Sequence, residues 1–263
     1  MDGTAKILVA SYPIGQVVWA RYFFHLLTLL PLFILFGQKP KLKQKRVGLQ
    51  ILRAFFLLGD TAFFFAALFF IPLANGKAVF FVSPIIMTAL APIFLRERVG
   101  YHRWVAVLVG FSGTLFILKP DNEGEFLGYC LALGSACFYA FYLLLTRKLS
   151  TSSSPLDTLL FTALVGTVVM TVALPFSWTM PNLNGWLLML AMGLLGTLSH
   201  FFIIKAFEAG NVSQLAPFSY AEIVSATIFG VVVFGDFPNF STWIGIALVI
   251  GCGVYIAKRQ HKR

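Results

Sequence analysis

The chain has 263 residues, of which 59% are hydrophobic and 11% are charged, and 20 Lys and Arg against 10 Asp and Glu give it a net charge of +10. A soluble domain carries about 25% charged residues, so this composition excludes a water-soluble globular protein and predicts that lipid surrounds most of the surface. The positive charge is dispersed over connections between apolar runs, which favours a membrane protein over a nucleic-acid-binding protein.

Nine apolar runs follow one another along the chain, each close to the ~20 residues that a helix needs to cross a bilayer. Their hydrophobicity is continuous rather than alternating with a period of two, which predicts helices rather than strands. The sequence therefore predicts an all-α polytopic membrane protein. The nine predicted spans cover residues 16–36, 49–71, 77–95, 104–118, 126–145, 156–176, 186–206, 213–235 and 243–257.

Basic residues collect in every second connection between these runs. They are Lys39, Lys41, Lys43, Lys45 and Arg46 after the first run, Arg96, Arg98 and Arg103 after the third, Arg147 and Lys148 after the fifth, and Lys258, Arg259, Lys262 and Arg263 after the last. Cytoplasmic loops of membrane proteins carry such an excess of Lys and Arg. We therefore expect a multi-pass protein of the bacterial inner (cytoplasmic) membrane with a cytoplasmic C-terminus. An odd number of spans then places the N-terminus outside.

The second half of the sequence repeats features of the first. When Glu97 is aligned with Asp236, an offset of 139 residues, Trp104 falls on Trp243, and both tryptophans open a glycine-spaced apolar run. Glu97 lies in a predicted cytoplasmic loop and Asp236 in a predicted outward loop, so the two copies run in opposite directions through the membrane. Inverted repeats are a recurrent plan of secondary transporters, with the substrate site near the midplane between the halves.

Four stretches carry a family resemblance. They are GQVVWARYFFHLL at 15–27, PLANGKAVFFVSPIIMTALAPIFLRERVGYHRW at 72–104, GFSGTLFILKP at 110–120 and LAPFSYAEIVSATIFGVVVFGDFP at 215–238. At these residues, and over nearly its whole length, the chain resembles the EamA-type permeases of the drug/metabolite transporter (DMT) superfamily. The resemblance implies ten helices in two inverted repeats of about five, with both termini in the cytoplasm.

The beginning of the chain departs from this family pattern. Its MDGTAK start resembles the tail end of the family's first helix. The resemblance therefore implies a first EamA-type repeat at 1–122 that lacks most of its first helix, followed by a second repeat at 123–263. A missing helix accounts for nine predicted spans where the family has ten. Because that helix helps to wall the family's central cavity, its loss would bear on activity.

Two acidic residues fall inside predicted spans, where an ionised group costs about 2.5–3.5 kcal/mol at the bilayer centre. Asp60 lies near mid-depth of 49–71, and Glu222 lies within 213–235. One interpretation makes each a protonatable or substrate-binding carboxylate. The other makes each a link between helices, with Asp60 bound to Arg21 or His25. The sequence leaves both interpretations open.

Arg21 and His25 stand four residues apart and so share one face of a helix. Both are candidates for substrate binding, although an arginine close to the outer head groups also suits an interfacial position. His200 lies in the inner half of its span, where it is either a packing hydrogen-bonder or a proton shuttle.

Other basic residues near span ends predict interfacial roles. Arg53 and Lys205 are expected to anchor the cytoplasmic ends of their helices. Lys77 opens the span 77–95, where it either snorkels towards the outer surface or meets an anionic substrate.

Aromatic residues make up 16% of the chain and include 29 Phe. Most are expected to face lipid or neighbouring helices. Tyr139, Tyr142 and Tyr220 are candidates to line a cavity and stack against a flat organic solute.

The sequence contains no GxxxxGK[ST] loop, no HExxH or GxSxG motif and no Cys/His metal box, so we expect neither an enzyme nor an ATP-driven pump, and no cofactor or metal. We expect a secondary transporter that moves a small organic metabolite by alternating access, with proton coupling or exchange as options. The alternatives are a non-transporting or partner-dependent membrane subunit and, less favoured, a membrane-embedded enzyme. The expected partners are the metabolite and membrane lipid, with a homodimer as one option and no nucleic acid.

Overall fold

The computed structural model is helical, and the residues that it describes contain no strand. Those residues are 1–42, 46–95, 123–150, 153–174, 178–209 and 221–235, together with 100–101, 104–105, 108–109, 112, 237, 240, 243–248 and 250–251.

Six helices in this part of the chain are long and apolar enough to cross a membrane. They are α2 (Ile14–Leu35), α3 (Val47–Phe70), α4 (Leu73–Phe80) continued by α5 (Ser83–Leu95), α7 (Glu123–Leu149), α8 (Pro155–Ala173) and α9 (Leu183–Ala209). Three shorter elements are α1 (Asp2–Val9), α11 (Ala221–Phe229) and the π-helical turn η3 (Gly230–Phe234). The expectation of a polytopic helical protein is confirmed.

The six long helices coincide with six of the predicted spans, within a few residues at each end. The spans predicted at 104–118, 213–235 and 243–257 fall wholly or partly outside the described residues. The count of nine spans therefore stays a prediction.

Local sequence determines where individual helices begin. At α8, the Ser154 hydroxyl accepts a hydrogen bond from the Asp157 amide at 3.2 Å, and Pro155 occupies the first helical turn, where its missing N–H is not needed. The same property of proline interrupts the third long span. Pro84 offers no N–H to the preceding turn, so α4 ends at Phe80 and a new helix, α5, begins at Ser83.

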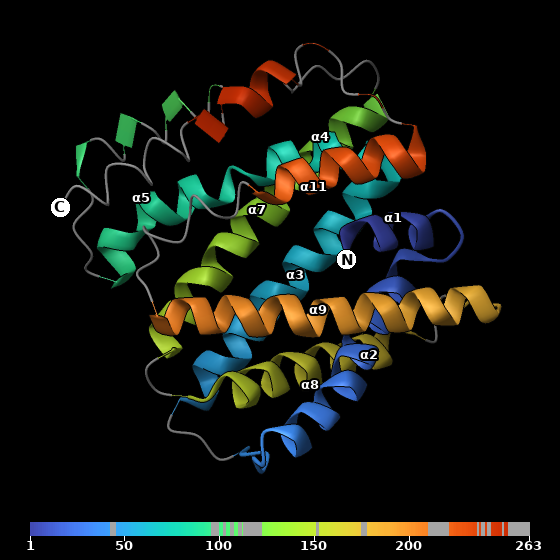
Figure 1. The fold of residues 1–263 in the computed structure, drawn as a ribbon, viewed down its shortest axis with the longest axis vertical. Coiled ribbons are helices and arrows are strands. Elements are labelled where there is room, and N and C mark those ends of the chain that lie inside the picture. The colour runs from blue at the N-terminus through green and yellow to red at the C-terminus, as the bar shows by residue number, and fades with distance from the viewer. Residues whose placement is uncertain are drawn as a thin grey trace.

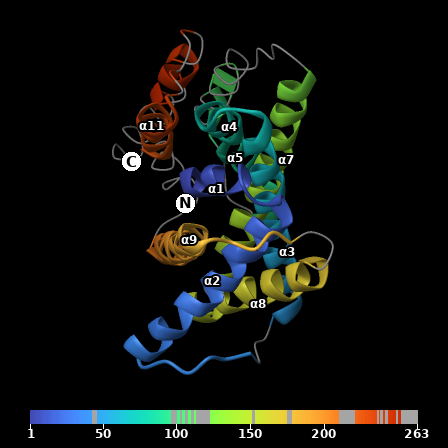
Figure 2. The ribbon, with the colours of Figure 1, turned by 90° about the vertical axis from the view of Figure 1, so that its right-hand side faces the viewer.

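The helices pack with α3 against α7 and with α2 against both α8 and α9 (Figure 1). Further contacts join α3 to α8, α4 and α5 to α7, and α11 to α4. The short helix α1 lies among α3, α4, α9 and α11, and Figure 2 shows it between α9 and the α4–α5 pair. The N-terminal residues are thus placed at the centre of the bundle.

A glycine sets the close crossing of α9 over α2. A Cβ atom added at Gly193 would approach the Phe24 backbone carbon to 2.7 Å and the His25 backbone nitrogen to 2.9 Å. The crossing thus leaves no room for a side chain at this position, and small residues allow helix backbones to approach so closely in membranes. The crossing brings the middle of α2, which carries Arg21, to the turn of α9 that carries His200.

The outer faces of the helices are apolar. Ile34, Phe69 and Val172 are 82%, 61% and 73% exposed, although each belongs to a long helix. Such surfaces match a hydrocarbon surrounding rather than water.

Candidate substrate-binding site

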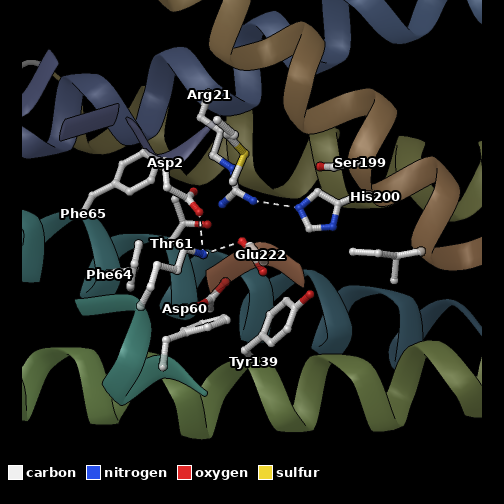
Figure 3. A pocket seen from close by; sticks show the side chains of 14 residues that line it. Asp2, Arg21, Asp60, Thr61, Phe64, Phe65, Tyr139, Ser199, His200 and Glu222 are labelled. Carbon is white, nitrogen blue, oxygen red and sulfur yellow. Dashed lines mark hydrogen bonds and ion pairs between the residues drawn. The ribbon is translucent and has the colours of Figure 1, made fainter. Parts of the chain in front are cut away.

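A cavity of about 180 Å³ lies inside the bundle, and Figure 3 shows ionisable and aromatic side chains converging on it. It is lined by Met1, Asp2, Arg21, Asp60, Thr61, Phe64, Phe65, Lys77, Phe80, Tyr139, Ser199, His200, Ile203 and Glu222. A second hollow of about 460 Å³ shares five of these residues, namely Met1, Asp2, Lys77, Ser199 and Glu222. The two hollows therefore adjoin, and α1, α4, α9 and α11 contribute walls to both.

Lys77 is the most heavily paired charge of the cavity. Its Nζ lies 2.5 Å from Asp2 Oδ2 and 2.6 Å from Glu222 Oε1, and it also lies over the rings of Phe64 and Phe80, at 4.7 and 4.6 Å from their centroids. The Lys77 side chain is 5% exposed. An ammonium group can remain charged at such a buried position because two carboxylates and two aromatic faces replace its water. The pairs also tie α4 to α1 and α11.

Arg21 points into the cavity from α2 and is held by neutral groups. Its Nη2 donates to His200 Nε2 at 2.8 Å, and its Nη1 lies 3.4 Å from the Tyr22 hydroxyl. Tyr22 in turn bonds Thr61 at 2.9 Å, and the Thr61 hydroxyl donates to the Leu57 carbonyl at 2.7 Å. Because the Thr61 hydroxyl already donates its proton to Leu57, it can only accept from the Tyr22 hydroxyl. The Tyr22 oxygen can in turn accept from Arg21.

The hydrogen bonds also fix the tautomer of His200. A guanidinium group only donates, so His200 Nε2 must accept from Arg21 and carries no proton. The proton of the neutral ring then sits on Nδ1, which lies 3.0 Å from the Tyr142 hydroxyl. His200 is therefore a neutral acceptor towards Arg21 and a donor towards Tyr142.

Arg53 continues this chain behind the cavity. The side chain is fully buried, and it donates to Thr146 at 2.6 Å, to Thr162 at 2.7 Å and to the Tyr142 hydroxyl at 2.8 Å. Its guanidinium carbon also lies 4.5 Å from the centroid of the Tyr142 ring. Arg53 and Arg21 are thus joined through Tyr142 and His200, and that chain connects α3, α7, α9 and α2.

Asp60 faces the cavity from α3 with one neutral partner. The Ser135 hydroxyl of α7 donates to its Oδ1 at 2.6 Å. The residue is 7% exposed, and no cation among the described residues lies within ion-pair distance of it. Asp60 is therefore a buried carboxylate that contacts the cavity without a countercharge.

The structure brings five of the eight predicted site residues together on the cavity wall: Arg21, Asp60, Tyr139, His200 and Glu222. His25 and Tyr142 are buried next to the site rather than on its wall. The His25 ring stacks on His200 with centroids 6.4 Å apart, and its Nε2 has no hydrogen-bond partner. Tyr220 lies outside the described residues.

Asp60 does link two helices, as one of its two interpretations holds, but its partner is Ser135 of α7 and not Arg21 or His25. Two expectations about basic residues were wrong. Arg53 is not an interfacial anchor, because three threonines and Tyr142 satisfy its guanidinium within the bundle. Lys77 does not snorkel outward, because two carboxylates from distant segments hold it inside.

Three polar residues of the site, Asp2, Thr61 and Ser199, were not predicted from the sequence. Asp2 stands outside every predicted span, although an acid opening an apolar N-terminal helix is a signal of its own. Thr61 and Ser199 are adjacent to the predicted residues Asp60 and His200, so neighbouring polar positions could have indicated them.

Comparison with known proteins finds one matching family and several similar proteins. The model of the EamA-like transporter family matches residues 4–119 and 126–257. A riboflavin transporter of Vibrio cholerae is 31% identical over 95% of this chain and 85% of its own length. An S-adenosylmethionine uptake transporter of Rickettsia bellii is 30% identical over 99% of this chain and 89% of its own length. One solved crystal structure superposes with a TM-score of 0.77 over 98% of this chain and 92% of that chain; at 20% identity it shows a shared fold.

Proposed function

This chain belongs to the EamA-like transporter family, and we propose that it is a secondary-active permease whose central cavity carries the solute across the membrane. It is a permease for a small organic metabolite, as its relatives named for riboflavin and S-adenosylmethionine transport indicate. The observation that supports the central cavity as the carrier site is the convergence of five charged side chains, Asp2, Arg21, Asp60, Lys77 and Glu222, on one hollow within the bundle. Arg21, Asp60 and Lys77 are buried, and charges so costly to bury are kept in membranes chiefly where a polar solute or ion must pass.

We propose that the bundle consists of two inverted repeats, at 1–122 and 123–263. Shifting the first half by 139 residues carries α2 onto 153–174 and α3 onto 186–209, where α8 and α9 lie. The same shift carries the ends of α1 to 141–148, inside α7. The loop around Glu97 contains three Arg, whereas the loop that begins at Asp236 contains no Lys or Arg. This difference in basic residues supports an antiparallel relation between the halves.

The helix contacts support the same two-fold relation. The packing of α2 on α9 has its counterpart in that of α3 on α8, and the packing of α3 on α7 has its counterpart in that of α1 on α9. The two-fold relation exchanges α2 and α8, so the contact between these two helices is its own counterpart. Pairs that recur in this way allow one half to rock against the other, which is the motion of alternating access.

We also propose a location and an orientation for the protein in the membrane. The six apolar helices and the bacterial relatives support a multi-pass protein of the inner membrane. We propose that the basic connections at 39–46 and 258–263 lie in the cytoplasm, because positive loops are retained on that side. The relatives are transporters by name, which supports transport rather than catalysis.

The test is uptake by the purified full chain in proteoliposomes. Labelled riboflavin and labelled S-adenosylmethionine are offered separately and then within a broader metabolite mixture. We expect accumulation of at least one metabolite above empty liposomes, and its loss in the cavity variant Arg21→Gln. The matched control is Lys205→Gln, which removes an exposed cation whose ion-pair partner among the described residues is Glu208. Absence of uptake for every compound in the mixture would contradict the proposal.

A further inference from the structure

Two opposite charges face the same cavity without pairing. Arg21 is 2% exposed and Asp60 is 7% exposed, and each is held by neutral groups, Arg21 by His200 and Tyr22 and Asp60 by Ser135. Within the described residues neither forms an ion pair. Ion pairing does occur in this cavity, because Lys77 pairs with both Asp2 and Glu222.

Both unpaired groups have hydrogen-bonding capacity left over. A guanidinium has five N–H donors, and two of the nitrogens of Arg21 make bonds to protein groups, one of them at the long distance of 3.4 Å. One oxygen of Asp60 accepts from Ser135, and the carboxylate has further acceptor sites. A buried charge without a partner is costly, so the field between these two groups favours a ligand that is itself dipolar.

We propose, on the basis of the proposed function, that the cavity recognises the zwitterionic head group of its substrate. Arg21 binds the carboxylate of that head group, and Asp60 binds its ammonium or other cationic group. The substrate class is an α-amino acid or a metabolite that ends in one. Arginine suits the first role because its planar fork can bind a carboxylate through two parallel hydrogen bonds.

The rest of the cavity fits the body of such a molecule. Phe64, Phe80 and Tyr139 supply aromatic walls, with the Phe80 and Tyr139 rings 4.9 Å apart. Aromatic faces stack on flat rings and attract cations. The adjoining hollow of about 460 Å³ gives room for the part of the substrate beyond its head group.

The same chemistry disfavours other solutes. A flat neutral molecule would displace water from Arg21 and Asp60 and offer neither charge a countercharge, so that only His200, Tyr22 and Ser135 would remain to compensate them, which disfavours its binding. A substrate with only a negative charge would bind Arg21 but be repelled by Asp60. A substrate with only a positive charge would bind Asp60 but be repelled by Arg21.

The experiment compares four probes against the full chain, by equilibrium binding in detergent and by uptake in proteoliposomes. S-adenosylmethionine and S-adenosylhomocysteine carry the zwitterionic head, 5′-methylthioadenosine has the same adenosine ring without it, and riboflavin is a flat uncharged ring system. We expect the two compounds with a zwitterionic head group to bind roughly tenfold or more tightly than the two compounds without one. A difference of this size corresponds to one charge-assisted interaction. This comparison needs only the unaltered protein.

Variants then assign the two charges. Arg21→Gln and Asp60→Asn should each weaken S-adenosylmethionine binding by roughly tenfold and leave 5′-methylthioadenosine within about twofold. Lys205→Gln and Glu208→Gln are the matched controls, because they remove the same charges from an exposed pair outside the cavity. Neither control should change the ratio of the affinities for the probes with and without the zwitterionic head group.

The outcomes separate this inference from the proposed function. Uptake of riboflavin or 5′-methylthioadenosine at least as good as that of the headed compounds would overturn the inference and leave the permease intact. Discrimination that survives both Arg21→Gln and Asp60→Asn would also overturn it. Failure to bind or take up any of the four probes would count against both.

Discussion

At the scale of single residues, the site is ordered by a hydrogen-bond chain that runs from a buried arginine to the cavity. Arg53 donates to Tyr142, Tyr142 accepts from His200, and His200 accepts from Arg21. Each link fixes the direction of the next, because the guanidinium groups at the two ends can only donate. The consequence is a cavity arginine with a defined orientation, held by groups that do not neutralise it.

Removing the central hydroxyl of this chain should destabilise the fold. In Tyr142→Phe, Arg53 and His200 each lose an acceptor at a fully buried position. An unsatisfied buried donor costs about 1–3 kcal/mol, so we expect a clearly lower melting temperature in detergent. Tyr12→Phe is the matched control, since the Tyr12 hydroxyl makes one long contact of 3.4 Å. Equal melting temperatures for the two variants would contradict the role given to Tyr142.

We expect proton coupling to depend on the carboxylate that lacks a fixed cation. Asp60 has no ion-pair partner among the described residues, whereas Glu222 is committed to Lys77 at 2.6 Å. We therefore expect the pH dependence of uptake to be flattened in Asp60→Asn and retained in Glu222→Gln. Uptake is measured across pH with each variant; unaltered pH dependence in both would remove these two residues from a coupling role.

At the scale of the helices, the close crossings decide which side chains can meet. Gly193 lets α9 lie on the backbone of α2, and this contact places His200 within hydrogen-bonding distance of Arg21. The interruption at Pro84 has a comparable effect on the other wall, because α4 ends as a short helix that presents Lys77 towards α1 and α11.

Enlarging Gly193 should therefore separate α2 from α9. In Gly193→Ala the new methyl group would meet the Phe24 backbone at 2.7 Å, and backbone cannot rotate away as a side chain can. We expect a loss of about 1–3 kcal/mol, the usual cost of overpacking, together with reduced uptake. Gly48→Ala in α3 has nothing within 4 Å of the added carbon and should be neutral or slightly stabilising. The two variants are compared by thermal unfolding in detergent. Equal melting temperatures would contradict the close contact of α9 with α2 at Gly193.

Helices could be predicted from the sequence far better than the site could. Each long span satisfies its own backbone hydrogen bonds, so length and continuous hydrophobicity are enough to predict α2, α3 or α9. The partners of a charge are set by packing instead. Lys77 meets Asp2 and Glu222 across 75 and 145 residues of chain, and no local pattern predicts that they share one cavity. Arg53 was misassigned for the same reason.

At the scale of the whole molecule, the bundle combines a lipid-compatible exterior with a polar, charge-bearing centre. The exposed side chains of the long helices are mainly apolar, while the ionisable groups of the cavity are turned inward. The cavity walls come from both proposed halves, with α1 to α4 on one side and α7, α9 and α11 on the other. A movement of one half against the other would therefore open and close this hollow.

Alternating access requires the cavity to open in turn to each side of the membrane, and its accessibility from the two sides can be measured. A single cysteine is placed at Ser199, which lines both hollows, after Cys130, Cys137 and Cys252 are replaced. Impermeant thiol reagents are then applied from the outside or the inside of oriented vesicles, with and without a transported metabolite. We expect labelling from either side and protection by that metabolite. Labelling from one side only, or labelling that the metabolite leaves unchanged, would contradict it.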